Sequence, residues 1–113
     1  HRQAGMNIDF QFFDVKNAVS EDVGLQLYRI LQEALNNVQK HAKAQHIDVQ
    51  LFVHDNELIM TIEDDGSGFE MEKQRTGLGT KNMRLRTEQV GGEFSISSAV
   101  GDGTSIMVTV PVS

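Results

Sequence analysis

The segment IDVQLFVHDNELIMTIEDD, residues 47–65, decides the fold. Apolar side chains occupy alternate positions before the central Asp55-Asn56 pair and again after it, and this period of two is typical of β-strands. The Asp55-Asn56 pair offers a tight turn between the two strands. The segment therefore predicts a β-hairpin with one apolar face, which other parts of the chain must cover.

Further strands are predicted on both sides of this hairpin. NIDFQFF, residues 7–13, alternates in the same way, and EFSISS (93–98) and TSIMVTVPV (104–112) are joined at AVGDG (99–103). Pro111 has no N–H to donate to a neighbouring strand, so it indicates an edge position or the end of a strand.

A long helix is predicted after residue 20. Ser20 is a good N-cap, and Glu21 and Asp22 are acids in the first turn, where the helix dipole favours them. No glycine or proline interrupts residues 25–44, so we expect five or six turns. The apolar residues of this segment form a broad stripe that must pack on the sheet: Val23, Leu27, Ile30, Leu31, Ala34, Leu35 and Val38.

A second helix is predicted from a cap at Thr80 to about Val90, where Gly91-Gly92 stops it. The polar, glycine-containing segment between residues 64 and 79 is expected to be a loop. Strands in hairpins pair antiparallel, and both helices need an apolar sheet face. The sequence therefore predicts a two-layer α/β (α+β) sandwich, with a mixed, largely antiparallel sheet covered on one face by helices.

Composition restricts the possible functions. The 113 residues are 39% hydrophobic and 23% charged, which suits one domain, residues 1–113 with a core of about 6–112. A net charge of −6 and a pI near 5.0 give no basic surface for nucleic acid. There is no cysteine for a disulfide or thiol chemistry, and no apolar run approaches the roughly 20 residues of a membrane span.

A carboxylate is predicted to enter the space between sheet and helices. Asp64 has the same parity as the apolar residues of its strand, and Thr104 has the same parity as the apolar residues of the last strand. A carboxylate there needs a donor from protein, water or ligand, because burying it alone costs roughly several kcal/mol. Gly66 and Gly68 leave backbone without Cβ, which a flat ligand can approach closely.

Polar groups suited to phosphate and a metal ion accompany this carboxylate. Glu33, Asn37, Lys40 and His41 lie on one stripe of the first helix, and a carboxylate or amide oxygen is the type of ligand that Mg²⁺ takes. Lys40 adds a positive charge for a phosphate. The segment 77–79, with Gly77, Leu78 and Gly79, precedes the second helix, where free N–H groups favour an anion. Together these features describe a nucleoside triphosphate pocket.

Each motif alone also fits a structural role. The polar stripe could be a solvated helix face, Asp64-Asp65-Gly66 a turn, and Gly77/Gly79 a loose helix entry. His41 alone is better explained as a hydrogen-bonded structural histidine. The joint occurrence favours function for Asn37, Asp64 and the glycines but adds little for His41 and Glu33.

Four motifs carry a resemblance to a known family. QEALNNVQKHA (32–42) resembles the N-box, DDGSGF (64–69) the first glycine box, and GLGTKNM (77–83) with GDGT (101–104) the later glycine boxes. These belong to the ATP-binding catalytic domain of two-component sensor histidine kinases, and the variants look most like the branch that pairs with helix-turn-helix response regulators. The resemblance covers about residues 8–112 and is specific because the motifs occur in the family's order and spacing.

The resemblance implies a Bergerat-type fold that binds ATP and Mg²⁺. Asp64 would accept a hydrogen bond from the adenine amino group beside Gly66 and Gly68, with Thr104 nearby. Asn37 would coordinate Mg²⁺, with Glu33 positioning the metal or handling a proton. The remaining residues would approach phosphate or ribose, or give N–H groups to the phosphates: Lys40, His41, Gly77, Leu78 and Gly79.

The implied activity is that of a protein histidine kinase, but this segment lacks the family's phosphoacceptor histidine in a helical hairpin. The partner would be a phosphoacceptor and dimerisation domain of the same kinase, and beyond it a response regulator. We expect a monomeric, cytoplasmic domain without nucleic-acid or direct membrane contact, and a mobile lid at about residues 67–76. Two alternatives stay open: an anti-sigma-factor-type serine kinase, and a nucleotide-binding regulatory module without phosphotransfer.

Overall fold

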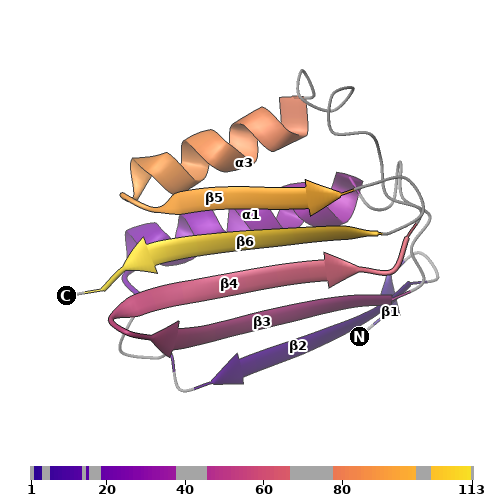
Figure 1. The fold of residues 1–113 in the computed structure, drawn as a ribbon, viewed down its shortest axis with the longest axis horizontal. Coiled ribbons are helices and arrows are strands. Elements are labelled where there is room, and N and C mark those ends of the chain that lie inside the picture. The colour runs from indigo at the N-terminus through magenta and orange to yellow at the C-terminus, as the bar shows by residue number, and fades with distance from the viewer. Residues whose placement is uncertain are drawn as a thin grey trace.

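The structure is a computed structural model that describes residues 2–3, 6–13, 15, 19–37, 46–66, 78–98 and 103–112. Within these ranges the chain forms one six-stranded sheet and two helices (Figure 1). In chain order the elements are β1 (Arg2–Gln3), β2 (Met6–Phe13), α1 (Glu21–Asn37), β3 (His46–His54), β4 (Glu57–Asp64), α3 (Leu78–Gln89), β5 (Glu93–Ser98) and β6 (Thr104–Pro111).

The sheet is mixed and largely antiparallel, as predicted. Its strand order is β1-β2-β3-β4-β6-β5, and only β2 and β3 run parallel among the pairs described. A parallel pair needs a crossover, which α1 supplies by carrying the chain back to the edge of the sheet where β2 began. After α3 the chain forms a second antiparallel pair, β5 and β6.

The central hairpin is confirmed. Asp55 and Asn56 have φ angles of 51° and 63°, and they connect His54 to its cross-strand partner Glu57. Two successive residues in this left-handed region are typical of the tight turn whose twist matches that of the strands. Pro111 is the last residue of β6 opposite Glu57, so the prediction that it marks a strand end is confirmed.

The predicted start of the first helix is confirmed. The Val23 N–H donates to Ser20 Oγ at 3.2 Å, which makes Ser20 the N-cap of α1. The helix has 17 described residues, and the predicted continuation through residues 38–44 lies outside the described part of the chain.

The second helix begins earlier than predicted. α3 starts at Leu78, so Thr80 is its third residue and not its cap. The end was predicted correctly: Gly91 has φ of 75°, and the Gly92 N–H donates to the Thr87 carbonyl at 3.0 Å.

The core lies between the sheet and the helices. In β4 and β6 the residues of one parity are buried, and they pack with parts of β2, β3 and β5, one stripe of α1 and the centre of α3, whereas Phe10 and Phe12 of β2 are exposed. The buried apolar residues are Ile8, Leu27, Ile30, Ala34, Ile47, Val49, Leu58, Met60, Ile62, Met83, Phe94, Ile106, Val108 and Val110. The predicted two-layer sandwich is therefore confirmed. Neither helix in the described ranges combines the length and the apolar character needed to cross a membrane.

Candidate functional site

The ends of three neighbouring strands bring the predicted carboxylate and hydroxyl together. β4 and β5 end, and β6 begins, at the same edge of the sheet, toward the right in Figure 1. The register places Asp64 opposite Thr104 on one side, and Ser98 opposite Thr104 on the other. Their parity directs these three side chains to the face that the helices cover.

Asp64 is half-buried and held by main-chain donors. Its Oδ1 accepts a hydrogen bond of 2.8 Å from the Gly66 N–H. Burial raises the pKa of Asp64 above its usual value, and hydrogen bonds from the backbone of Gly66 and Thr104 oppose this shift, while the neighbouring Asp65 charge adds to it. The carboxylate is therefore partly desolvated, which makes an additional hydrogen-bond donor favourable.

The Thr104 side chain is oriented by Ser98. Ser98 Oγ donates to the Gly103 carbonyl at 3.0 Å and lies 2.9 Å from Thr104 Oγ1. A serine hydroxyl has one proton, and this one is given to Gly103, so Thr104 donates to Ser98. The lone pairs of the buried Thr104 hydroxyl consequently remain as acceptors beside Asp64.

Gly103 brings two backbone segments into close approach. A Cβ atom at this position would lie 2.3 Å from the Asp64 carbonyl oxygen, a distance that real side chains do not adopt. Its φ of 75° also lies in the left-handed region. Only glycine therefore allows the residue before β6 to approach the end of β4 this closely.

A polar cavity of about 240 Å³ opens off these strand ends. Residues of both parities along β4, β5 and β6 line it, so it lies at the strand ends and not on one face alone. Its lining consists of Glu63, Asp64, Ser97, Ser98, Gly103, Thr104 and Ser105. The cavity is lined mainly by hydroxyl, carboxylate and backbone groups, which suits a hydrogen-bonding ligand better than an apolar one.

Only some of the residues predicted to bind the metal ion and the phosphates lie in the described part of the chain. Glu33 and Asn37 are both partly buried on α1, one turn apart, and Asn37 is its last described residue. Leu78 and Gly79 open α3, so their N–H groups have no acceptor within the helix. Four other predicted residues lie outside the described part of the chain: Lys40, His41, Gly68 and Gly77.

The structure thus brings Asp64, Gly66 and Thr104 next to one another. Their roles toward a ligand stay predictions. Sequence reasoning missed Ser98 and Gly103 as parts of this arrangement. Ser98 shares the parity of Phe94 and Ile96, which was the available signal. Gly103 belongs to the GDGT motif, but the contact that demands glycine appears only when β4 and β6 are paired.

Comparison with known proteins identifies relatives of this chain. Residues 22–113 match the family described as "Histidine kinase-, DNA gyrase B-, and HSP90-like ATPase". The chain is 33% identical over 96% of its length to the signal transduction histidine-protein kinase/phosphatase DegS of Brevibacillus brevis. It is 36% identical over 93% of its length to the sensor histidine kinase LiaS of Bacillus subtilis. It spans only 28% and 29% of those two relatives.

A solved structure shows the same fold. The histidine kinase domain of the blue-light activated histidine kinase EL346 from Erythrobacter litoralis superposes with a TM-score of 0.76. The match covers 97% of this chain and 53% of that one, at 24% identity. The predicted fold and the resemblance to sensor histidine kinases are therefore confirmed, and the chain belongs to the histidine kinase-, DNA gyrase B- and HSP90-like ATPase family.

Proposed function

We propose that this domain binds ATP with Mg²⁺ and positions the γ-phosphoryl group for transfer to a histidine on a separate domain. The observation that carries this proposal is the half-buried Asp64 carboxylate at the end of β4, between the backbone of Gly66 and the buried Thr104. Family membership and the histidine kinases among the relatives support the same function.

Asp64 suits adenine because its partly desolvated carboxylate gains most from a new donor. The exocyclic amino group of adenine is such a donor, whereas guanine has a carbonyl oxygen at the same ring position. A buried carboxylate facing that oxygen would be left with an unpaired acceptor, which costs about 1–3 kcal/mol or more. Thr104 Oγ1 adds a second acceptor, since its proton is given to Ser98.

The metal and phosphate groups would be held by the helices. Glu33 and Asn37 offer a carboxylate and an amide oxygen one turn apart on α1, and this hard oxygen pair fits Mg²⁺. When bound, the ion would neutralise phosphate charge. Leu78 and Gly79 would donate N–H groups from the start of α3, with Gly77, Lys40 and His41 assigned to the phosphates or ribose and Gly68 to the base.

The complete protein would act in two-component signalling. Its phosphoacceptor and dimerisation domain would supply the attacking imidazole, and a response regulator would receive the phosphoryl group. In this arrangement the present domain contributes positioning and electrostatic stabilisation, while the covalent change occurs between ATP and the partner histidine. We place the domain in the cytoplasm, where ATP is available.

Calorimetric titration with ATP, with and without Mg²⁺, tests nucleotide binding, and GTP is the control. We expect ATP binding that Mg²⁺ strengthens and GTP binding that is at least about tenfold weaker. Asn37→Ala should remove the Mg²⁺ effect while ATP alone still binds. Equal binding of the two nucleotides would contradict the adenine assignment, and an unchanged Mg²⁺ effect would contradict the role of Asn37.

Phosphotransfer is tested separately by adding a phosphoacceptor domain and labelled ATP. We expect an acid-labile phosphohistidine. Acid-stable phosphoserine on a protein substrate would instead favour the serine kinase alternative, and nucleotide binding without any transfer to either would favour a regulatory module.

A further inference from the structure

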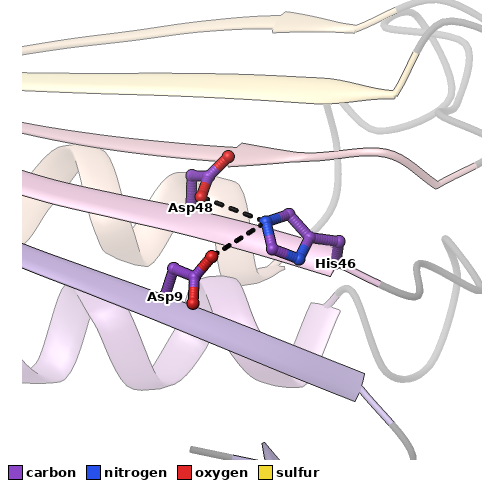
Figure 2. Close-up of side chains that lie close together, drawn as sticks. All are labelled: Asp9, His46 and Asp48. Atoms are coloured by element: carbon purple, nitrogen blue, oxygen red, sulfur yellow. Dashed lines mark hydrogen bonds and ion pairs between the residues drawn. The ribbon is translucent and has the colours of Figure 1, made fainter.

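A histidine and two aspartates converge on the sheet face opposite the helices. Asp9 of β2 and Asp48 of β3 are direct partners in the parallel register, so their side chains lie next to each other on one face. His46 lies two positions before Asp48 on the same strand and therefore on the same face. Figure 2 shows the imidazole lying against both carboxylates.

One nitrogen atom of the imidazole faces both carboxylates. His46 Nε2 lies 3.2 Å from Asp9 Oδ2 and 3.1 Å from Asp48 Oδ1. The three atoms that could bind a metal ion, one from each residue, all lie within 4.8 Å of one another. No Lys or Arg forms an ion pair with either carboxylate among the residues that the structure describes.

A single proton on Nε2 cannot form a full hydrogen bond with both carboxylates. Nε2 carries at most one proton, which would have to be shared between two acceptors, and an unprotonated Nε2 would direct its lone pair at two negative groups. A cation at the point where the three groups meet would satisfy all three. We propose that Asp9, His46 and Asp48 form a binding site for a divalent transition-metal ion of the Zn²⁺ or Mn²⁺ type, for which imidazole with carboxylates is a suitable ligand set.

The separations agree with ligands that share one ion. Metal–ligand bonds of about 2.0–2.2 Å imply neighbouring ligand atoms about 2.8–3.6 Å apart in octahedral or tetrahedral geometry. Both distances from Nε2 lie in this range. The side chains are 40%, 61% and 54% exposed for His46, Asp9 and Asp48, so water can complete the coordination.

The histidine backbone is fixed independently of the metal. The His46 N–H donates to Asp65 Oδ1 at 3.0 Å, and the Asp65 N–H donates to the His46 carbonyl at 3.2 Å. This reciprocal pair anchors the first residue of β3, which reduces the ordering cost of metal binding. The site is separate from the proposed ATP site, because it faces the other side of the sheet.

The test is titration of the nucleotide-free domain with Zn²⁺ by calorimetry, and with Mn²⁺ by amide NMR. We expect saturable Zn²⁺ binding, and Mn²⁺ broadening of signals from residues 7–11 and 46–50. His46→Gln, Asp9→Asn and Asp48→Asn should each weaken binding at least about tenfold. His54→Gln is the matched control: His54 also faces an aspartate, Asp55, at 3.3 Å, but it has no third ligand in the described structure.

Binding that survives in His46→Gln and Asp9→Asn, or Mn²⁺ broadening around residues 46–50 that is unchanged in these variants, would overturn the proposal. No binding by the unaltered domain at 1 mM metal, about the weakest affinity of protein divalent-ion sites, would overturn it as well. Circular dichroism of each variant shows whether it is folded. Two of the three substitutions replace aspartate by asparagine of the same shape, so they separate loss of a ligand from loss of structure.

Discussion

Asp64 and Asp65 are adjacent carboxylates with opposite environments. Asp64 is half-buried on the helix-covered side, where burial raises its pKa, and it accepts a main-chain hydrogen bond from Gly66. Asp65 is exposed, and its Oδ1 accepts from the His46 N–H on the neighbouring strand. The difference teaches that residue type does not assign function at this edge of the sheet. Asp64, the last residue of β4, has the buried parity of that strand, whereas Asp65 lies just beyond the strand and accepts from the backbone of β3.

The largest expected effect comes from the backbone that carries Asp64. Gly103→Ala should lower the free energy of unfolding by about 2–5 kcal/mol, because the left-handed conformation is strained for alanine and its Cβ would clash with the Asp64 carbonyl. Denaturant unfolding measures this. Gly91→Ala is the matched control: it has the same φ of 75° but no neighbour within 4 Å. Equal losses in the two variants would show that backbone strain alone matters and that the close approach does not.

The comparison itself is tested by changing one carboxylate at a time. Asp64→Asn should weaken ATP binding about tenfold to a hundredfold, because a hydrogen bond to a charged group contributes about 1.5–3 kcal/mol. Asp65→Asn should leave ATP binding unchanged, since an amide oxygen can still accept from the His46 N–H. Calorimetry of both variants measures the difference. Comparable losses would mean that parity does not separate their roles.

The smallest effect concerns stability without nucleotide. Because the pKa of Asp64 is raised in the folded state, its contribution to stability is fully present below the ordinary value of 3.8 and is lost as pH rises through the folded pKa. Asp64→Asn should therefore gain stability relative to the unaltered domain as pH rises from acid to neutral. We expect less than about 1 kcal/mol, because the group is only half-buried.

Thermal or denaturant unfolding of both proteins at several pH values measures this difference. A stability of Asp64→Asn relative to the unaltered domain that stays constant, or that falls, as pH rises would contradict the raised pKa.

Much of the fold was predictable because local rules determine it. The Asp55-Asn56 turn, the Ser20 cap and the Gly91-Gly92 stop depend on residues close in sequence, and all three were predicted correctly. The start of α3 was predicted three residues late, because a glycine-containing first turn carries no strong local signal.

The candidate site was predictable to a smaller extent. The parity of Asp64 and Thr104 followed from the period of two, and the structure confirms that they face each other across β4 and β6. The roles of Glu33 and Asn37 stay predictions, as do those of the residues outside the described ranges.

By itself the sequence determined the class of fold, the element order and the family, because period, caps, turns and motif spacing are properties of neighbouring residues. Only the tertiary structure decided that Gly103 must be glycine, that Ser98 orients Thr104, and that Asp9 meets His46. The Gly103 and Asp9 contacts join segments that are far apart in the chain, and the Ser98 contact depends on how β5 and β6 pair. Register and distance between such strands are set by how the sheet pairs, which no single segment encodes.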